Sequence, residues 1–209
     1  MLRYRQQRRE NQALRRRESA PSQMLGSSSS FRALLSQLDK VTRSNGRVML
    51  TGLSGVGKEL AARLIHRNSQ RAEGPFVVVN AATIAPDQME SALFGEEDAQ
   101  GRTTRVGLFE KAHNGTLLLD EVADMPLGTQ SKILRVLVDQ QFERVGGTRR
   151  VKVDVRIISS TARNLEAMIA EGAFREDLYH RLAVVPVVVP PLADRREDIP
   201  VLAGFFLDK

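Results

Sequence analysis

The chain has 209 residues, of which 42% are hydrophobic and 27% are charged, and this composition is typical of a soluble globular protein with a buried core. It contains no cysteine, which excludes disulfides and thiolate metal sites and favours a reducing cytoplasm. Its longest apolar run, residues 183–192, is too short to cross a bilayer, and no apolar signal segment follows the basic N-terminus. We therefore expect a cytoplasmic protein with no membrane partner.

The net charge of +6 is concentrated at one end of the chain. Residues 1–20 contain seven Arg and two Glu and so carry +5, which leaves the remaining residues close to neutral. Because this segment has few apolar residues, we predict that residues 1–22 form a solvated, basic helical linker. An arm that binds DNA or RNA phosphates is the alternative.

A loop is predicted at residues 21–30, and apolar residues at helical spacing then predict a helix at 31–43. Strand-like runs alternate with helical patterns after it. We predict strands at 47–52, 76–80, 116–121, 153–161 and 184–189, helices at 58–68, 131–141 and 165–172, and a hairpin within 141–152. This alternation is typical of an α/β fold in which helices cover both faces of a parallel sheet, and the proline in the last strand favours an edge position.

Residues 195–209 begin a new amphipathic pattern that stops at the end of the sequence. We expect this segment to be the start of a helical lid subdomain that continues in a longer protein. The predicted organisation is therefore a linker at 1–22, a nucleotide-binding domain at 23–194 and a truncated lid at 195–209.

Residues 52–60, GLSGVGKEL, lie between a predicted strand and a predicted helix. They match the phosphate-binding pattern G-x-x-x-x-G-K-[ST], except that Glu59 replaces the hydroxyl residue that normally binds magnesium. The glycines would let backbone N–H groups surround phosphate oxygens, and Lys58 would reach the β- and γ-phosphates. A glycine-rich turn with a chance lysine is the alternative. The predicted nucleotide-binding residues are Gly52, Leu53, Ser54, Gly55, Val56, Gly57, Lys58, Glu59 and Leu60.

A second motif, GTLLLDE at residues 115–121, ends an apolar strand in two carboxylates. At the carboxyl edge of a parallel sheet they would lie beside the phosphate loop. Asp120 is suited to hold Mg²⁺, and Glu121 is suited to polarise the water that attacks ATP.

Five further motifs follow in order along the chain: LFG at 93–95, RVGG at 144–147, VDVRII at 153–158, FREDLYHRL at 174–182 and PPLADRREDIP at 190–200. Together with the two motifs above, they resemble the AAA+ domain of bacterial enhancer-binding proteins, the sigma-54-type response regulators of the nitrogen-regulation group, and in particular its NtrX branch. The resemblance covers residues 23–209 and implies a P-loop AAA+ fold. Glu is typical after the loop lysine in that family, so magnesium would rest on Asp120, phosphates and water.

The resemblance also implies roles for polar residues at two strand ends. Asn80 matches a residue that restrains the catalytic Glu121 in a nucleotide-dependent switch, although an Asn at a strand end can equally cap a turn. Thr161 matches the first sensor of the γ-phosphate. Ala162 beside it lacks the polar side chain often found there.

Arg175 and Arg181 match arginine fingers that reach the ATP of a neighbouring subunit. Their spacing places them on different faces of a helix, so that one could act in trans while the other forms a structural ion pair. A surface salt bridge with Glu176 or Asp177 is the alternative for each.

The resemblance implies ATP/ADP and Mg²⁺ as cofactors and a homo-oligomer, from a dimer to a hexameric ring. It also implies RNA polymerase or its sigma factor as a partner, a receiver domain that meets a cognate sensor kinase, and a DNA-binding domain; both domains would lie outside this sequence. The family's sigma-54-contacting motif, GAFTGA, should follow Gly95, but residues 94–110 read FGEEDAQGRTTRVGLFE. Two functions stay open: a self-assembling ATPase, or an ATP-responsive module with little turnover that acts through DNA binding without remodelling sigma-54.

Overall fold

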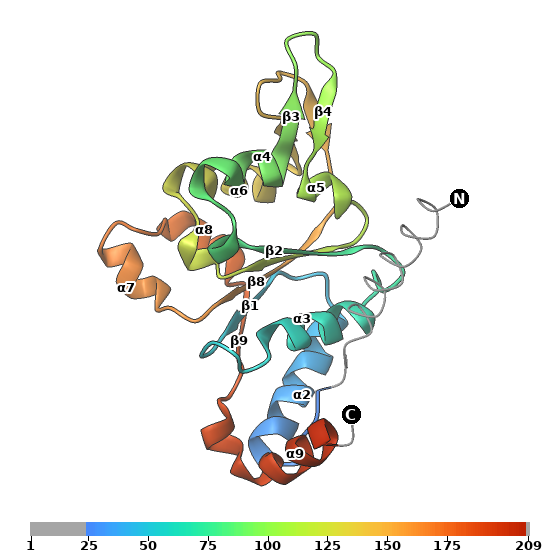
Figure 1. Ribbon diagram of the computed structural model, residues 1–209, viewed down its shortest axis with the longest axis vertical. Helices are drawn as coiled ribbons and strands as arrows, with labels where there is room; N and C mark the ends of the chain where they lie inside the picture. The colour runs from blue at the N-terminus through green and yellow to red at the C-terminus, as the bar shows by residue number, and fades with distance from the viewer. Residues whose placement is uncertain (1–23, 208–209) are drawn as a thin grey trace, which may run out of the picture.

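A computed structural model describes residues 24–207, so the predicted linker at 1–22 lies outside the described residues. Its centre is a parallel sheet in the order β2-β5-β8-β1-β9 (Figure 1). The strands are β1 (Val48–Thr51), β2 (Phe76–Asn80), β5 (Thr116–Asp120), β8 (Arg156–Thr161) and β9 (Val185–Val188). All neighbouring pairs are parallel, and the proline-containing strand β9 lies at an edge, as predicted.

Helices cover both faces of this sheet, which confirms the predicted fold class. The α-helices are α2 (Ser29–Thr42), α3 (Lys58–Arg67), α4 (Met89–Phe94), α5 (Leu108–Lys111), α6 (Leu127–Asp139), α7 (Leu165–Ala170), α8 (Glu176–Leu182) and α9 (Ile199–Leu207). Short 3₁₀ helices are η1 (Ala81–Thr83), η2 (Pro86–Gln88), η3 (Val122–Asp124) and η4 (Leu192–Asp198).

Alternate side chains of the strands enter two separate cores. Leu117 and Leu119 of β5 pack with α4, α5, α6, α7 and α8, whereas Leu118 packs with α2 and α3 on the other face. All three leucines are fully buried. An uninterrupted apolar run is the pattern expected of a central parallel strand, because both of its faces are covered.

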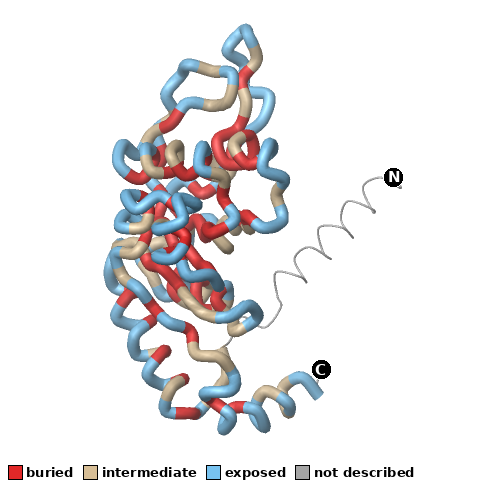
Figure 2. The backbone as a smooth tube through the Cα atoms, turned by 90° about the vertical axis from the view of Figure 1, so that its left-hand side faces the viewer, coloured by how far each residue is buried: buried red, intermediate tan, exposed pale blue. Residues whose placement is uncertain are grey.

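Two antiparallel hairpins project from the end of the molecule that lies at the top of Figure 1. One pairs β6 (Gln141–Glu143) with β7 (Arg150–Lys152), as predicted; the other, β3 (Gly95–Glu97) with β4 (Thr103–Val106), was not predicted. A bridge between Glu96 and Val145 joins them. Figure 2 shows that buried segments concentrate around the central sheet and that the hairpin tips are exposed.

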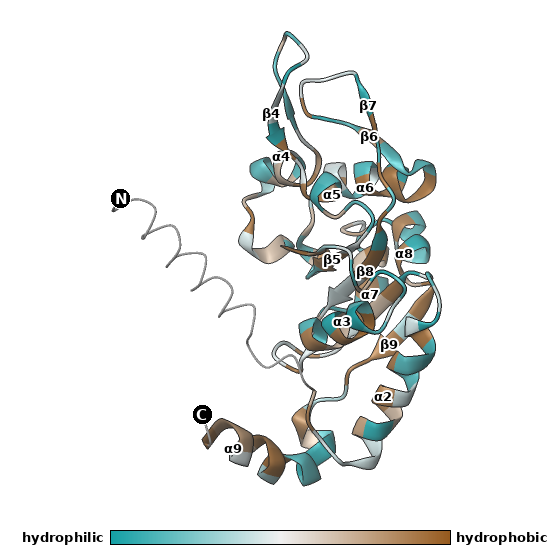
Figure 3. Cartoon of the chain, turned by 90° about the vertical axis from the view of Figure 1, so that its right-hand side faces the viewer, coloured by the Kyte–Doolittle hydropathy of each residue, from teal (hydrophilic) through white to brown (hydrophobic). Residues whose placement is uncertain are grey.

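The prediction of an amphipathic pattern near the C-terminus is wrong for α9. Its residues are almost all apolar, and none of them is buried (Figure 3). An apolar helix in water exposes surface that would be stabilised by further packing. None of the helices in the described part is both long and apolar enough to span a membrane.

Candidate functional site

The phosphate loop connects β1 to α3 and depends on three glycines with positive φ angles, of 153° at Gly52, 78° at Gly55 and 101° at Gly57. A Cβ atom at Gly52 would lie 2.6 Å from the carbonyl oxygen of Val189, so a side chain is excluded there. Gly57 is the N-cap of α3 and has no side chain to occupy the free N–H groups. The first turn of α3 therefore keeps backbone donors that can bind an anion.

Lys58 is 6% exposed, and its ammonium group is held inside the loop. Its Nζ atom donates to the carbonyl oxygens of Gly52, at 3.0 Å, and Leu53, at 3.3 Å. It also lies 3.1 Å from Oε1 of Glu121. The loop lysine and the second carboxylate of the DE motif are thus in direct contact.

The two carboxylates lie at the carboxyl edge of β5. Asp120 accepts hydrogen bonds from Nδ2 of Asn80, at 3.1 Å, and from the hydroxyl of Ser160. Glu121 has a left-handed backbone with φ of 51°, and its Oε2 atom accepts from the backbone N–H of Ala162 at 3.0 Å. Four segments of chain therefore meet around these two side chains.

Asn80 shows one of the two arrangements expected for it, the cap of a turn, and also contacts Asp120. Its Oδ1 atom caps η1 by accepting from the N–H of Ala82 at 3.0 Å, and its Nδ2 atom contacts Asp120, the neighbour of Glu121. The restraint of Glu121 by Asn80 stays a prediction. The contact seen here orients the carboxylate predicted to hold magnesium.

Thr161 and Glu59, two further residues predicted to bind nucleotide, have different surroundings. Thr161 is buried at the end of β8, where its hydroxyl accepts from the N–H of Arg163 at 3.0 Å. Glu59 turns away from the loop and pairs with Arg63 at 2.7 Å. None of the described residues forms a cluster of three or more His, Cys, Asp or Glu side chains that could hold a metal ion.

A cavity of about 460 Å³ lies beside the phosphate loop. Its walls come from the loop with Leu60, from the start of the described chain at Met24 and Leu25, and from η4 and α9. Arg195 is the only charged residue that lines it. An apolar cavity next to a phosphate loop has the character expected of a site for a nucleotide base.

The two predicted arginine fingers lie at opposite ends of α8. Arg175 precedes the helix and pairs with Asp177 at 2.7 Å, and its Nη1 atom donates to the hydroxyl of Ser131 at 3.3 Å. Arg181 is exposed, and within residues 24–207 its side chain has no hydrogen-bond or ion-pair partner. The alternative of a salt bridge with Asp177 is therefore seen for Arg175.

Two residues around the candidate site, Ser160 and Arg195, were not predicted from the sequence. Ser160 binds Asp120, and the only signal for it was its place beside Thr161 at the strand end. Arg195 belongs to the motif at 190–200, but no role followed from its position.

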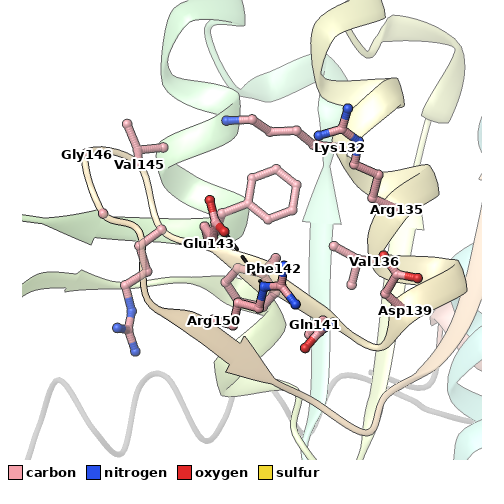
Figure 4. Close-up of a pocket in the computed structure, with 13 residues that line it drawn as sticks. Lys132, Arg135, Val136, Asp139, Gln141, Phe142, Glu143, Val145, Gly146 and Arg150 are labelled. Carbon is pink, nitrogen blue, oxygen red and sulfur yellow. Dashed lines mark ion pairs between the residues drawn. The ribbon is translucent and has the colours of Figure 1, made fainter.

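A second cavity, of about 440 Å³, contains none of the predicted site residues (Figure 4). It lies between α6 and the hairpin of β6 and β7 and is lined in part by Lys132, Arg135, Glu143 and Arg150. Arg144, also in its wall, forms ion pairs with Glu97 and Glu110. Much of its charge is therefore neutralised within the protein.

A phosphate loop and two carboxylates at the carboxyl edge of a five-stranded parallel sheet define a P-loop nucleotide-binding domain of the AAA+ type. Residues 24–188 match the family model described as the sigma-54 interaction domain, and the chain belongs to this family.

Its relatives include a nitrogen assimilation regulatory protein and a DNA-binding transcriptional regulator. The chain is 58% identical over 188 residues to the nitrogen assimilation regulatory protein NtrX of Azorhizobium caulinodans, covering 90% of this chain and 41% of the relative. It is 50% identical over 192 residues to the DNA-binding transcriptional regulator NtrC of Klebsiella pneumoniae, covering 90% and 41%.

Solved structures agree with this assignment. The crystal structure of NtrX from Brucella abortus in complex with ADP matches with a TM-score of 0.87 and 60% identity, covering 97% of this chain and 46% of that chain. The same protein in complex with ATP matches with a TM-score of 0.86 and 61% identity, covering 95% and 44%. The chain thus spans less than half the length of these relatives.

Proposed function

We propose that this chain is the ATP-binding and ATP-hydrolysing module of a cytoplasmic two-component regulator of the nitrogen-regulation type, and that it controls transcription as an oligomer. The observation that carries the proposal is the contact of 3.1 Å between the buried Lys58 and the partly exposed Glu121 at the phosphate loop. The Brucella abortus relative, solved with ADP and with ATP, supports the choice of nucleotide.

The contacts of Lys58 suggest how binding prepares the site. Lys58 contacts Glu121 and two loop carbonyls. The phosphates of ATP would compete for the ammonium group, and the free N–H groups of the loop would bind them at the same time. Glu121 would then lose a partner while keeping its bond to the N–H of Ala162. A carboxylate released in this way can accept the proton of an attacking water.

Asp120 is suited to the metal that accompanies ATP. Bound Mg²⁺ would neutralise charge that develops on the phosphates. Asn80 and Ser160 both donate to Asp120 and so fix the direction of its lone pairs. These second contacts would hold the carboxylate in position when the nucleotide enters.

The positive charge needed for hydrolysis would come partly from another copy of the chain. Arg181 is exposed and unpaired in the described part, while Arg175 is already neutralised by Asp177. We therefore assign the role of arginine finger in trans to Arg181 and a structural role to Arg175. Assembly, which could extend from a dimer to a hexameric ring, would complete the site.

A second candidate function is an ATP-responsive module with little turnover, acting through DNA binding and not through remodelling of sigma-54. The hairpin of β3 and β4 favours it. Residues 98–102, at the exposed turn of this hairpin, are Asp, Ala, Gln, Gly and Arg. Asp98 and Arg102 pair with each other at 2.8 Å, and neither offers apolar surface to a partner.

The binding step can be tested with the chain as it stands. Lys58→Ala should weaken ATP binding by ~2–3 kcal/mol, because it removes a charged hydrogen-bond donor from the phosphates. Lys111→Ala, at an exposed lysine on α5, is the control and should leave the affinity unchanged. Calorimetric titration with ATP and Mg²⁺ measures both. Equal affinities of Lys58→Ala and the parent would contradict the assignment of this loop.

Turnover separates the two candidate functions. ATP hydrolysis by the parent would be followed across a series of protein concentrations, in this chain and in a version extended through the expected lid. Measurable turnover that rises with concentration supports the self-assembling ATPase. Binding without turnover in both versions supports the regulatory module.

A further inference from the structure

Arg195 connects the C-terminal part of the chain to the phosphate loop. It lies within η4 at a residue whose φ of −139° and ψ of 47° interrupt the helical turns. Its side chain is 8% exposed, and its Nη2 atom donates to the carbonyl oxygen of Val56 at 3.1 Å. The guanidinium group also lies 5.7 Å from the ring centroid of Phe31 on α2. One arginine therefore contacts the loop and the first described helix.

This arginine is supported by a buried carboxylate at the end of η4. Asp198 is fully buried and accepts hydrogen bonds from the N–H groups of Ser27, at 2.6 Å, and Ser28, at 2.8 Å. It also accepts from the Ser28 hydroxyl at 2.8 Å, and that oxygen accepts from the N–H of Phe31 and so caps α2. Asp198, Ser27 and Ser28 together are called the clasp below.

The charge on Asp198 adds to this support. Burial alone would raise the pKa of its carboxyl group, but the three hydrogen bonds of the clasp and the nearby charge of Arg195 hold that pKa below its usual value. The carboxylate therefore stays ionised at neutral pH and attracts Arg195. Nε of Arg195 is buried and has no partner among the described residues, so the position of this side chain depends on few contacts.

The bond to Val56 fixes the direction of a peptide group. In a planar trans peptide the C=O and the following N–H point in opposite directions. Arg195 holds the carbonyl of Val56, so the N–H of Gly57 must point away from Arg195. Gly57 precedes α3, where no helical carbonyl accepts this N–H. Glycine tolerates both orientations of such a peptide, so a contact with the Val56 carbonyl can select one of them.

We propose that Arg195 is a positioning residue of the nucleotide site, which holds the Val56–Gly57 peptide with its N–H directed at the phosphates, and that the clasp holds Arg195 in place. The inference rests on the proposed function, because it concerns the same phosphate loop. It adds that the start of α2 and η4 set nucleotide affinity together. A displacement of Ser27 and Ser28 would weaken binding without touching any residue of the loop.

The test compares variants of two adjacent arginines in the full chain. Arg195→Met keeps most of the side-chain volume but removes the donor, and it should weaken ADP binding about tenfold, the usual scale for one hydrogen bond to a charged group. Arg195→Lys should recover part of this loss. Arg196→Met, at the exposed neighbour, is the matched control and should bind ADP like the parent.

Two further readouts separate positioning from folding. The amide resonance of Gly57 should shift on addition of ADP to the parent and shift much less in Arg195→Met. Ser28→Ala should weaken ADP binding by about two- to fivefold, since it removes one hydrogen bond of the clasp. Combined with Arg195→Met it should add little, because both changes act through one contact.

The outcomes are distinguishable from failure of the proposed function. If the parent does not bind ADP, the proposed function itself is wrong. If the parent binds and Arg195→Met binds equally well, with the same Gly57 shift, Arg195 does not position the loop and the nucleotide site stands. If Arg195→Met is unfolded, Ser28→Ala decides: an unchanged affinity overturns the proposal. Additive losses in the double variant would overturn the role of the clasp.

Discussion

The charged groups at the carboxyl edge of the sheet have partners within the protein, whereas Arg181 on α8 has none among residues 24–207. At the sheet edge, Lys58 contacts Glu121, and Asp120 accepts two hydrogen bonds. On α8, Arg181 is an exposed cation without a partner in the part of the chain that the structure describes. It also lies close enough to Arg47 for its charge to lower the pKa of that residue, although burial is the larger cause.

This difference supports the proposal that a second copy of the chain completes the nucleotide site. The charged groups at the sheet edge are partnered within the protein. Among residues 24–207, Arg181 has no ion-pair partner and has a like-charged neighbour, Arg47, so an anion from outside would stabilise it. An ATP bound to a second copy would supply such an anion.

The largest expected effect on the ATPase rate comes from replacing Arg181, the exposed cation on α8. Arg181→Ala should lower the ATPase rate by roughly 10³-fold, the scale known for arginine fingers, without weakening ATP binding. Arg175→Ala is the comparison variant, and it should lower the rate much less because its charge is already paired with Asp177.

Mixing variants tests whether Arg181 acts in another subunit. Equal amounts of Arg181→Ala and Lys58→Ala should regain part of the activity, because each chain contributes the half that the other lacks. Turnover that is independent of protein concentration, together with no gain on mixing, would show that each site is completed within one chain.

A smaller effect is expected at the sheet edge. Glu121→Gln should retain ATP but hydrolyse it about 10²-fold more slowly, since the amide cannot accept a proton from water. Single-turnover measurements with bound ATP separate the two steps. Hydrolysis at the parental rate would rule out Glu121 as the residue that activates water.

The smallest effect on turnover is expected at the hairpin of β3 and β4, which belongs to neither region. Asp98→Ala and Arg102→Ala should change the ATPase rate by less than about twofold, as for surface substitutions away from the site. A steady-state assay at a fixed protein concentration checks this. A loss of an order of magnitude would mean that the hairpin is coupled to hydrolysis.

The same hairpin also provides a test of the second candidate function, in which the chain does not remodel sigma-54. A gripping tip must bury apolar side chains, each contributing about 1.5–3 kcal/mol, and the turn at residues 98–102 offers only charged, polar and small residues. We therefore expect no capture of sigma-54 in the presence of a transition-state analogue of ATP hydrolysis, measured by gel shift. Analogue-dependent capture by the unmodified chain would place it among proteins that act on sigma-54 directly.

Local sequence predicted the central sheet well, because continuous apolar runs such as residues 117–119 are unusual outside central parallel strands. It also predicted the phosphate loop and the acidic strand end. It did not predict the β3–β4 hairpin, whose strands are short and largely polar, with every residue of β4 exposed. The contact of Arg195 with Val56 spans 139 residues of sequence, and no periodic pattern reports such a contact.

The strand order also bears on how the chain is made. Of the strands in the central sheet, β1 leaves the ribosome first, but its neighbours are β8 and β9, and the contact between Val48 and Ser159 spans 111 residues. Pairing that is so distant in sequence is slow, and a nascent domain exposes its unpaired apolar strands until the last one emerges. The nucleotide loop, which begins where β1 ends, therefore cannot take its shape until almost the entire domain has been synthesised. A polypeptide released before β9 should aggregate and fail to bind nucleotide.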